Sequence, residues 1–102
     1  MNEPKTMSYD VLLQLVEATK EYKEHQLTSE APDLYERCRD LSAQLGTEAF
    51  GVPERGWNVF DIIYALIGAF RLMPEDVTNE YVAKAVAELL GACGVKVEAA
   101  NE

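Results

Sequence analysis

The longest apolar stretch of the chain, residues 59–70, reads VFDIIYALIGAF. Asp61 is its one charged residue, and on a helix the apolar side chains would cover nearly the whole circumference. A helix of this composition is typical of the centre of a bundle or of an oligomer interface. The stretch is shorter than the roughly 20 apolar residues that span a bilayer. We therefore predict an all-α fold, a compact three- to four-helix bundle with a central apolar helix over about residues 59–72.

The residues around this helix predict how it begins and what it crosses. Asn58 has the side chain of a helix N-cap, and Asp61, three residues later, has the place of the reciprocal partner in a capping box. We interpret Asp61 as part of this cap rather than as a buried catalytic acid. Gly68 costs about 1 kcal/mol relative to alanine inside a helix. We therefore expect a close helix crossing at Gly68, beside Ala65 and Ala69.

Two helices are predicted before this one. The first spans about residues 8–27, with Ser8 as its N-cap. The second opens at Thr28 and Ser29 and ends at Gly46, because glycine readily takes the left-handed conformation that follows a helix. Residues 46–57 contain three glycines and a proline, so we expect an irregular segment there.

A fourth helix is predicted after a turn at Pro74, capped near Thr78 and ended by Gly94. Residues 95–97 alternate like a strand, but the sequence indicates no partner strand for them. We interpret residues 1–102 as a single helical domain with frayed ends at 1–7 and 98–102. The predicted inner face of the fourth helix consists of Tyr81, Val82, Ala85, Val86, Leu89 and Cys93.

Eighteen acidic residues against nine basic ones give the 102-residue chain a net charge of −9. Neutralising phosphate groups requires clustered Lys and Arg, so we expect neither direct nucleic-acid binding nor attachment to an anionic membrane. A charged protein partner is expected to be basic. The first residues lack the basic and apolar regions of a secretory signal, and we predict a soluble cytoplasmic protein. Cys38 and Cys93 lie on apolar helical faces, so we expect two buried free thiols.

Residues able to carry catalysis are scarce. His25 is the only histidine, lies among acidic residues, and is interpreted as an ordinary surface residue. No glycine-rich phosphate loop and no EF-hand loop occurs. The sequence therefore predicts no catalytic residue, no metal site and no cofactor. One alternative stays open, a Mg²⁺-dependent nucleotide hydrolase of the all-α pyrophosphohydrolase type, because two carboxylate pairs have suitable helical spacings. These pairs, on predicted solvent faces, are Glu21 with Glu24 and Glu36 with Asp40.

Acidic side chains form a row along the outer face of each of the first two helices. Aromatic residues in the 46–57 segment add apolar anchors of the kind that dominate protein interfaces. The predicted partner-binding residues are Asp10, Glu17, Glu21, Glu24, Asp33, Glu36, Asp40, Phe50, Arg55 and Trp57.

These features predict a small acidic, non-catalytic protein-binding domain that acts on a basic, nucleic-acid-binding surface. The analogy is one of class only: nucleic-acid mimics, bacteriocin immunity proteins and anti-restriction or anti-CRISPR inhibitors share charge rather than a motif. Two other interpretations stay open. The acidic rows are only a solvated face, or the chain is a homo-oligomeric structural or adaptor subunit. The contact surface of that subunit would be Leu12, Leu15, Val16 and Tyr22.

Overall fold

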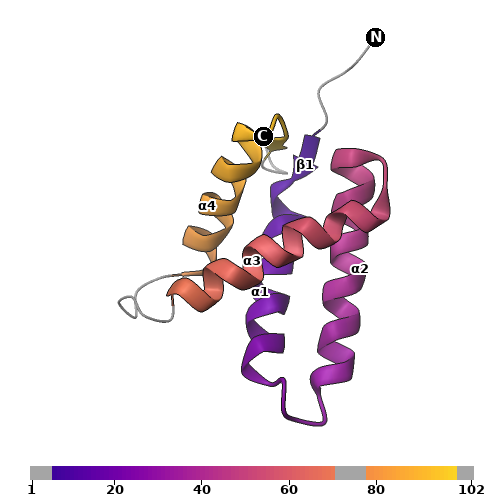
Figure 1. Ribbon diagram of the computed structural model, residues 1–102, viewed down its shortest axis with the longest axis vertical. Helices are drawn as coiled ribbons and strands as arrows, with labels where there is room; N and C mark the ends of the chain where they lie inside the picture. The colour runs from indigo at the N-terminus through magenta and orange to yellow at the C-terminus, as the bar shows by residue number, and fades with distance from the viewer. Residues whose placement is uncertain (1–5, 71–77, 99–102) are drawn as a thin grey trace.

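A computed structural model describes residues 6–70 and 78–98 of the chain, in which four helices pack together beside a small two-stranded parallel sheet (Figure 1). The mostly helical bundle confirms the predicted fold class. The elements in chain order are β1 (Thr6–Ser8), α1 (Tyr9–Glu24), α2 (Ala31–Phe50), the short 3₁₀ helix η1 (Pro53–Arg55), α3 (Gly56–Phe70), α4 (Asn79–Ala92) and β2 (Lys96–Glu98).

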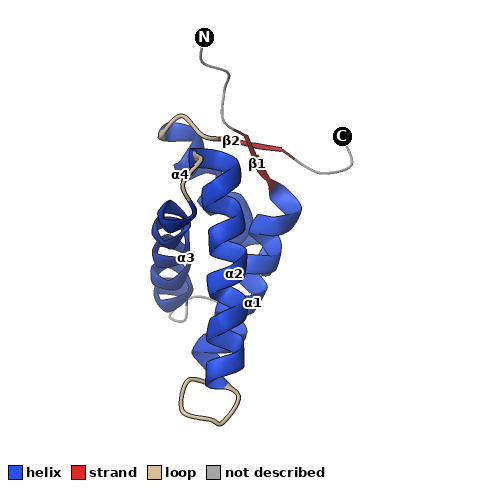
Figure 2. Cartoon of the chain, turned by 90° about the vertical axis from the view of Figure 1, so that its right-hand side faces the viewer, coloured by secondary structure: helices blue, strands red, loops and turns tan. Residues whose placement is uncertain are grey.

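The helices α1 and α2 form an antiparallel hairpin, and α3 crosses obliquely over it (Figure 1). The helix α4 packs against α1 and α3, so α1 and α3 each contact all three other helices. The free end of the hairpin extends beyond α3 in both side views (Figures 1 and 2). This leaves the lower part of α1 and α2 without a covering layer of helices.

The buried core is centred on α1. Ser8 caps this helix as predicted, because its Oγ accepts a hydrogen bond from the backbone N–H of Val11 at 3.4 Å. Leu12, Leu15 and Val16 have no exposed surface. The prediction that these three residues form an oligomer contact is therefore wrong, because the core of the chain already buries them; Tyr22, the fourth residue of that predicted surface, is half-buried.

The helix α2 does not end at Gly46, and the prediction of an irregular segment from that residue is wrong. The helix continues to Phe50 and ends at Gly51, which takes the left-handed conformation at φ 72°. Gly46 is needed for another reason. A Cβ there would lie 2.5 Å from the carbonyl oxygen of Pro53 and 2.6 Å from the backbone nitrogen of Gly56. Residues 52–56 thus fold back directly onto α2.

The start of α3 also differs from its prediction. The helix begins at Gly56, so Asn58 and Asp61 lie within it and are exposed; neither acts in a cap, and Asp61 does not face the core. A Cβ on Gly56 would overlap the carbonyl group of Ser42, so this glycine lets α3 begin in backbone contact with α2. The close helix approach is therefore at Gly56.

Gly68 does not mark a helix crossing. Its nearest neighbour is the Lys23 side chain, whose Nζ would lie 3.6 Å from an added Cβ, and Ala65 and Ala69 are exposed. The face of α3 that packs into the core carries Val59, Phe60 and Ile63. The predicted extension of this helix to residue 72 and the turn at Pro74 lie outside the described residues.

The helix α4 is capped as predicted, since Thr78 Oγ1 accepts a hydrogen bond from the backbone N–H of Tyr81 at 3.1 Å. The prediction of its inner face is only partly correct. Tyr81 and Leu89 are 58% and 48% exposed, and Cys93 is exposed. The helix is thus rotated relative to the prediction. The residues it buries are Val82, Ala83, Val86 and Leu90.

The short strand β2 does have a partner. It pairs in parallel with β1, with Met7 opposite Val97. Met7 is 1% exposed, so the expectation of frayed ends is wrong for residues 6, 7 and 98. Gly94, at φ 89°, makes the turn that returns the chain from α4 to β1. The sheet ties the beginning of the described chain to its end.

Candidate aromatic docking surface

Five aromatic rings form a continuous row where α3 crosses the α1–α2 hairpin. Consecutive ring centroids lie 5.5 Å, 5.7 Å, 5.2 Å and 5.9 Å apart. We call this set the aromatic row. Its members, in spatial order, are Tyr22 of α1, Tyr35 of α2, and Trp57, Phe60 and Tyr64 of α3.

The row arises from helical spacing on α3 combined with the position of the hairpin. Trp57, Phe60 and Tyr64 follow one another at steps of three and four, so they share one face of α3. That face meets the hairpin, and Trp57 packs edge-on against Phe60 at an interplanar angle of 89°. Edge-to-face and offset arrangements of this kind are the favoured ones for aromatic pairs.

The row lies at the margin of the core and is most open to solvent at Tyr35. Phe60 is 8% exposed, whereas Tyr35 is 44% exposed. Tyr22, Trp57 and Tyr64 are half-buried and pack against the core. The rings are thus held in place from below while part of their surface remains open, which is how aromatic anchors at protein interfaces are displayed.

Tyr64 is fixed by two polar contacts from the end of α1. The Lys23 Nζ lies 3.8 Å from the centroid of its ring, and Gln26 Nε2 donates a hydrogen bond of 2.9 Å to its hydroxyl oxygen. An ammonium over an aromatic face is attracted by the negative charge density of the ring. Gly68 leaves room for the Lys23 side chain beside this contact. One end of the row therefore already holds a cation.

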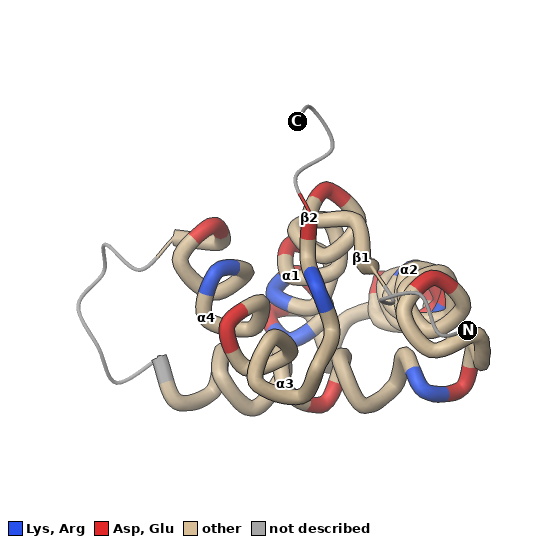
Figure 3. Tube along the Cα trace, turned by 90° about the horizontal axis from the view of Figure 1, so that it is seen from above, with Lys and Arg blue, Asp and Glu red and all other residues tan. Residues whose placement is uncertain are grey.

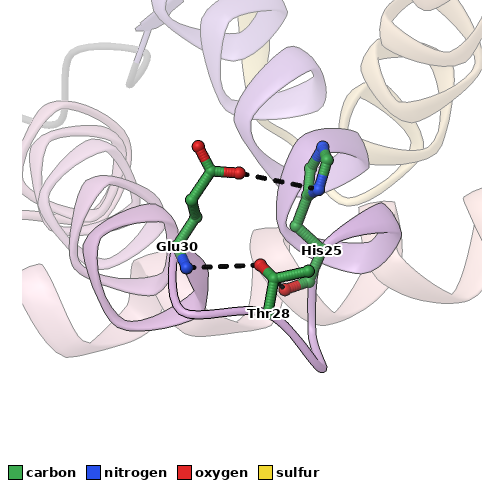
Figure 4. A network of polar contacts seen from close by, with 3 residues as sticks. All are labelled: His25, Thr28 and Glu30. Carbon is green, nitrogen blue, oxygen red and sulfur yellow. Dashed lines mark hydrogen bonds and ion pairs between the residues drawn. The ribbon is translucent and has the colours of Figure 1, made fainter.

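The tip of the hairpin, residues 25–30, is fastened by its own polar contacts (Figure 4). Thr28 Oγ1 donates to the carbonyl oxygen of His25 at 2.8 Å and accepts from the backbone N–H of Glu30 at 3.2 Å. His25 Nδ1 lies 3.8 Å from Glu30 Oε2. Leu27 protrudes from this turn fully exposed, at 101% of its reference area. The tip thus presents an apolar side chain on an ordered turn.

The predicted acidic rows lie on the surface of α1 and α2, and acidic positions occur on all four helices (Figure 3). On α2, Arg39 lies 3.5 Å from Glu36 and 3.6 Å from Asp40, so it offsets part of that row. Of the acids in the predicted rows, those that are exposed and form no ion pair with another residue in the described ranges are Asp10, Glu17, Glu21, Glu24 and Asp33.

The three residues predicted from the 46–57 segment do not form one anchor. Trp57 belongs to the aromatic row. Phe50 is half-buried at the end of α2, and Arg55 is exposed in η1. The sequence prediction missed Tyr35, Phe60 and Tyr64 as site residues and named Tyr22 only for the oligomer alternative. Their helical spacing was visible, but the row joins rings from three helices, and only the crossing of α3 over the hairpin brings them together.

Within residues 6–70 and 78–98, no group of three or more His, Cys, Asp or Glu side chains is arranged to hold a metal ion. Both carboxylate pairs considered for hydrolysis are exposed. Both cysteines are free as predicted, but Cys93 is exposed, and only Cys38 is buried. Burial raises the pKa of the Cys38 thiol above its ordinary value, an effect that a hydrogen bond with Thr19 partly opposes. No described helix is long and apolar enough to cross a membrane.

Comparisons with protein-family models, with curated proteins and with solved structures found no significant match for the chain.

Proposed function

We propose that the chain is a small cytoplasmic, non-catalytic domain that binds a basic protein partner through the aromatic row, with the acidic rows of α1 and α2 flanking the contact. The observation that carries the proposal is the open position of the row. Tyr35 keeps 44% of its surface exposed although it packs against the rings of Tyr22 and Trp57. Partly exposed Trp and Tyr clusters are the residues that most often dominate binding energy at interfaces.

The charge of the chain supports the choice of a basic partner. A net charge of −9 raises the association rate with a positive surface and repels acidic ones. Four exposed acids of α1 form no ion pair with a described residue, and one exposed lysine, Lys20, lies among them, so this helix presents a net negative charge to a partner surface rich in Lys or Arg. An inhibitor of a nucleic-acid-binding protein, which occupies the basic surface in place of nucleic acid, is the class that combines these properties.

The test begins with affinity capture from cells that express the protein, followed by calorimetry with the purified partner. The wild type is compared with the charge-reversal variant Glu17→Lys, Glu21→Lys, Glu24→Lys. We expect the wild-type affinity to fall as salt rises, and the variant to bind more weakly and with a smaller salt dependence. Equal affinity and equal salt dependence for the two proteins would refute a basic partner.

One observation favours a second candidate, a homo-oligomeric subunit. The apolar helix α3 lies on the outside of the hairpin with Ala65 and Ala69 exposed, and Leu89 of α4 is 48% exposed. A helix as apolar as α3 is usually covered on all sides. Light scattering over a range of concentrations tests this candidate. A molar mass that stays at 11.4 kDa at every concentration would exclude it, whereas a dimer that Leu89→Lys dissociates would support it.

A further inference from the structure

We infer that the Tyr35–Trp57 pair of the aromatic row takes up an arginine side chain of the partner, whose guanidinium group stacks on the exposed tyrosine ring. This inference rests on the proposed function and specifies the chemistry of its contact. Tyr35 and Trp57 are inclined by only 27°, with centroids 5.7 Å apart. The two rings are stacked with an offset, and we call this pair, in which Tyr35 is 44% exposed, the platform.

One ring of the row already has a cation over its face. At the far end of the row the Lys23 ammonium lies over Tyr64. Within the described part of the chain, no cation lies over Tyr35 or Trp57. Arg37 follows Tyr35 by two residues and is exposed, and Arg39, one turn after Tyr35, is paired with Glu36 and Asp40. Tyr35, the most exposed ring of the row, is therefore where a cation from outside can bind.

One carboxylate lies beside this platform, on α3. Asp61 comes one turn after Trp57, the spacing at which side chains are neighbours on a helix surface, and it is exposed. Glu36, the residue after Tyr35 in α2, points elsewhere on its helix and is already paired with Arg39. An arginine can stack its planar group on an aromatic ring while its N–H groups donate to a carboxylate, whereas lysine offers only a compact ammonium. The combination of the ring platform with Asp61 thus favours arginine over lysine.

The probe is a hexa-arginine peptide, compared with a hexa-lysine peptide of the same charge. Trp57 is the only tryptophan in the chain, so its fluorescence reports binding at the platform directly. We expect hexa-arginine, but not hexa-lysine, to change the Trp57 emission and to bind about threefold more tightly by calorimetry, the ratio that corresponds to a surface cation–π contact.

The variants Tyr35→Leu and Tyr35→Phe separate the ring from its hydroxyl group, and Tyr81→Leu is the matched control on α4, 58% exposed and outside the row. Tyr35→Leu should bind hexa-arginine about threefold more weakly, while Tyr35→Phe and Tyr81→Leu bind as the wild type does. Circular dichroism and thermal unfolding confirm that each variant is folded.

Equal affinity of both peptides, or unchanged hexa-arginine binding by folded Tyr35→Leu, would overturn the inference. Either result would leave the proposed function standing if the charge-reversal variant still weakened binding of the captured partner. The proposed function fails on the separate result that this partner binds with no dependence on salt or on the α1 acids.

Discussion

Gly56 allows α3 to begin in contact with α2, and its replacement by alanine tests that geometry. The added Cβ would overlap the Ser42 carbonyl group, which belongs to the backbone of α2 and cannot rotate away. Relief requires the start of α3 to move outward, together with Trp57, the next residue. Forced overpacking of this kind costs about 1–3 kcal/mol. Because the atoms in the way belong to the backbone, we expect Gly56→Ala to destabilise the protein by about 3 kcal/mol, the upper end of this range.

Gly91→Ala is the matched control. Gly91 also lies in a helix, but a Cβ there would meet no atom within 4 Å, so the substitution should stabilise α4 by up to about 1 kcal/mol. Urea unfolding followed by circular dichroism measures both changes, and Trp57 fluorescence reports the local displacement. For a domain of this size, 1 kcal/mol corresponds to a shift in Tm of roughly 4–8 °C. A Gly56→Ala protein as stable as the wild type would refute the contact between α3 and Ser42.

Four further predictions concern the core, a cap and the two thiols. Leu15→Ala should destabilise the protein by about 2–5 kcal/mol because Leu15 is fully buried. Leu27→Ala, at the exposed tip, should change the free energy of unfolding little. Equal effects of the two substitutions in urea unfolding would contradict the position of Leu15 in the core. Thr78→Ala removes the α4 cap and should cost about 1 kcal/mol, whereas Thr47→Ala, an exposed control in α2, should not. A thiol reagent should label Cys93 at once and Cys38 only after unfolding. Burial raises the folded-state pKa of Cys38, so its thiol ionises more readily in the unfolded chain. The free energy of unfolding of the wild type, relative to that of Cys38→Ala, should therefore fall as the pH rises above about 9. A difference between the two proteins that stays constant with pH would contradict this prediction.

The features predicted correctly from the sequence are those that depend on neighbouring residues alone. Ser8 and Thr78 cap their helices because each side chain reaches a backbone N–H three residues later. The acids on α1 are exposed because they lie opposite its continuous apolar face. In such cases helical periodicity is enough to place a side chain.

The errors concern glycines and surfaces whose environment depends on distant parts of the chain. Gly46 is a residue type that often ends a helix, but α2 continues past it. The backbone of residues 52–56 occupies the space beside Gly46, which is why a glycine is needed there. Gly68 has the signal of a helix crossing, yet it faces the Lys23 side chain. Periodicity alone could not show which of these close approaches the fold makes.

The candidate site was predicted in part. Trp57 was identified from its place in a short aromatic segment, but Tyr35 was not among the predicted binding residues. Tyr35 packs against Tyr22 of α1 and Trp57 of α3 and still remains 44% exposed. The relation between helix lengths and the crossing point of α3 is a tertiary property, and it decides which aromatic residues reach the surface.

The proposed function requires that the aromatic row bind the basic partner. The most direct measurement is the Kd of the captured partner for Tyr35→Ala and for the wild type, by calorimetry at low salt. An interface anchor of this kind contributes at least about 1.4 kcal/mol, so we predict a Kd at least tenfold higher for the variant. A folded Tyr35→Ala protein that binds its partner with wild-type affinity would contradict the claim.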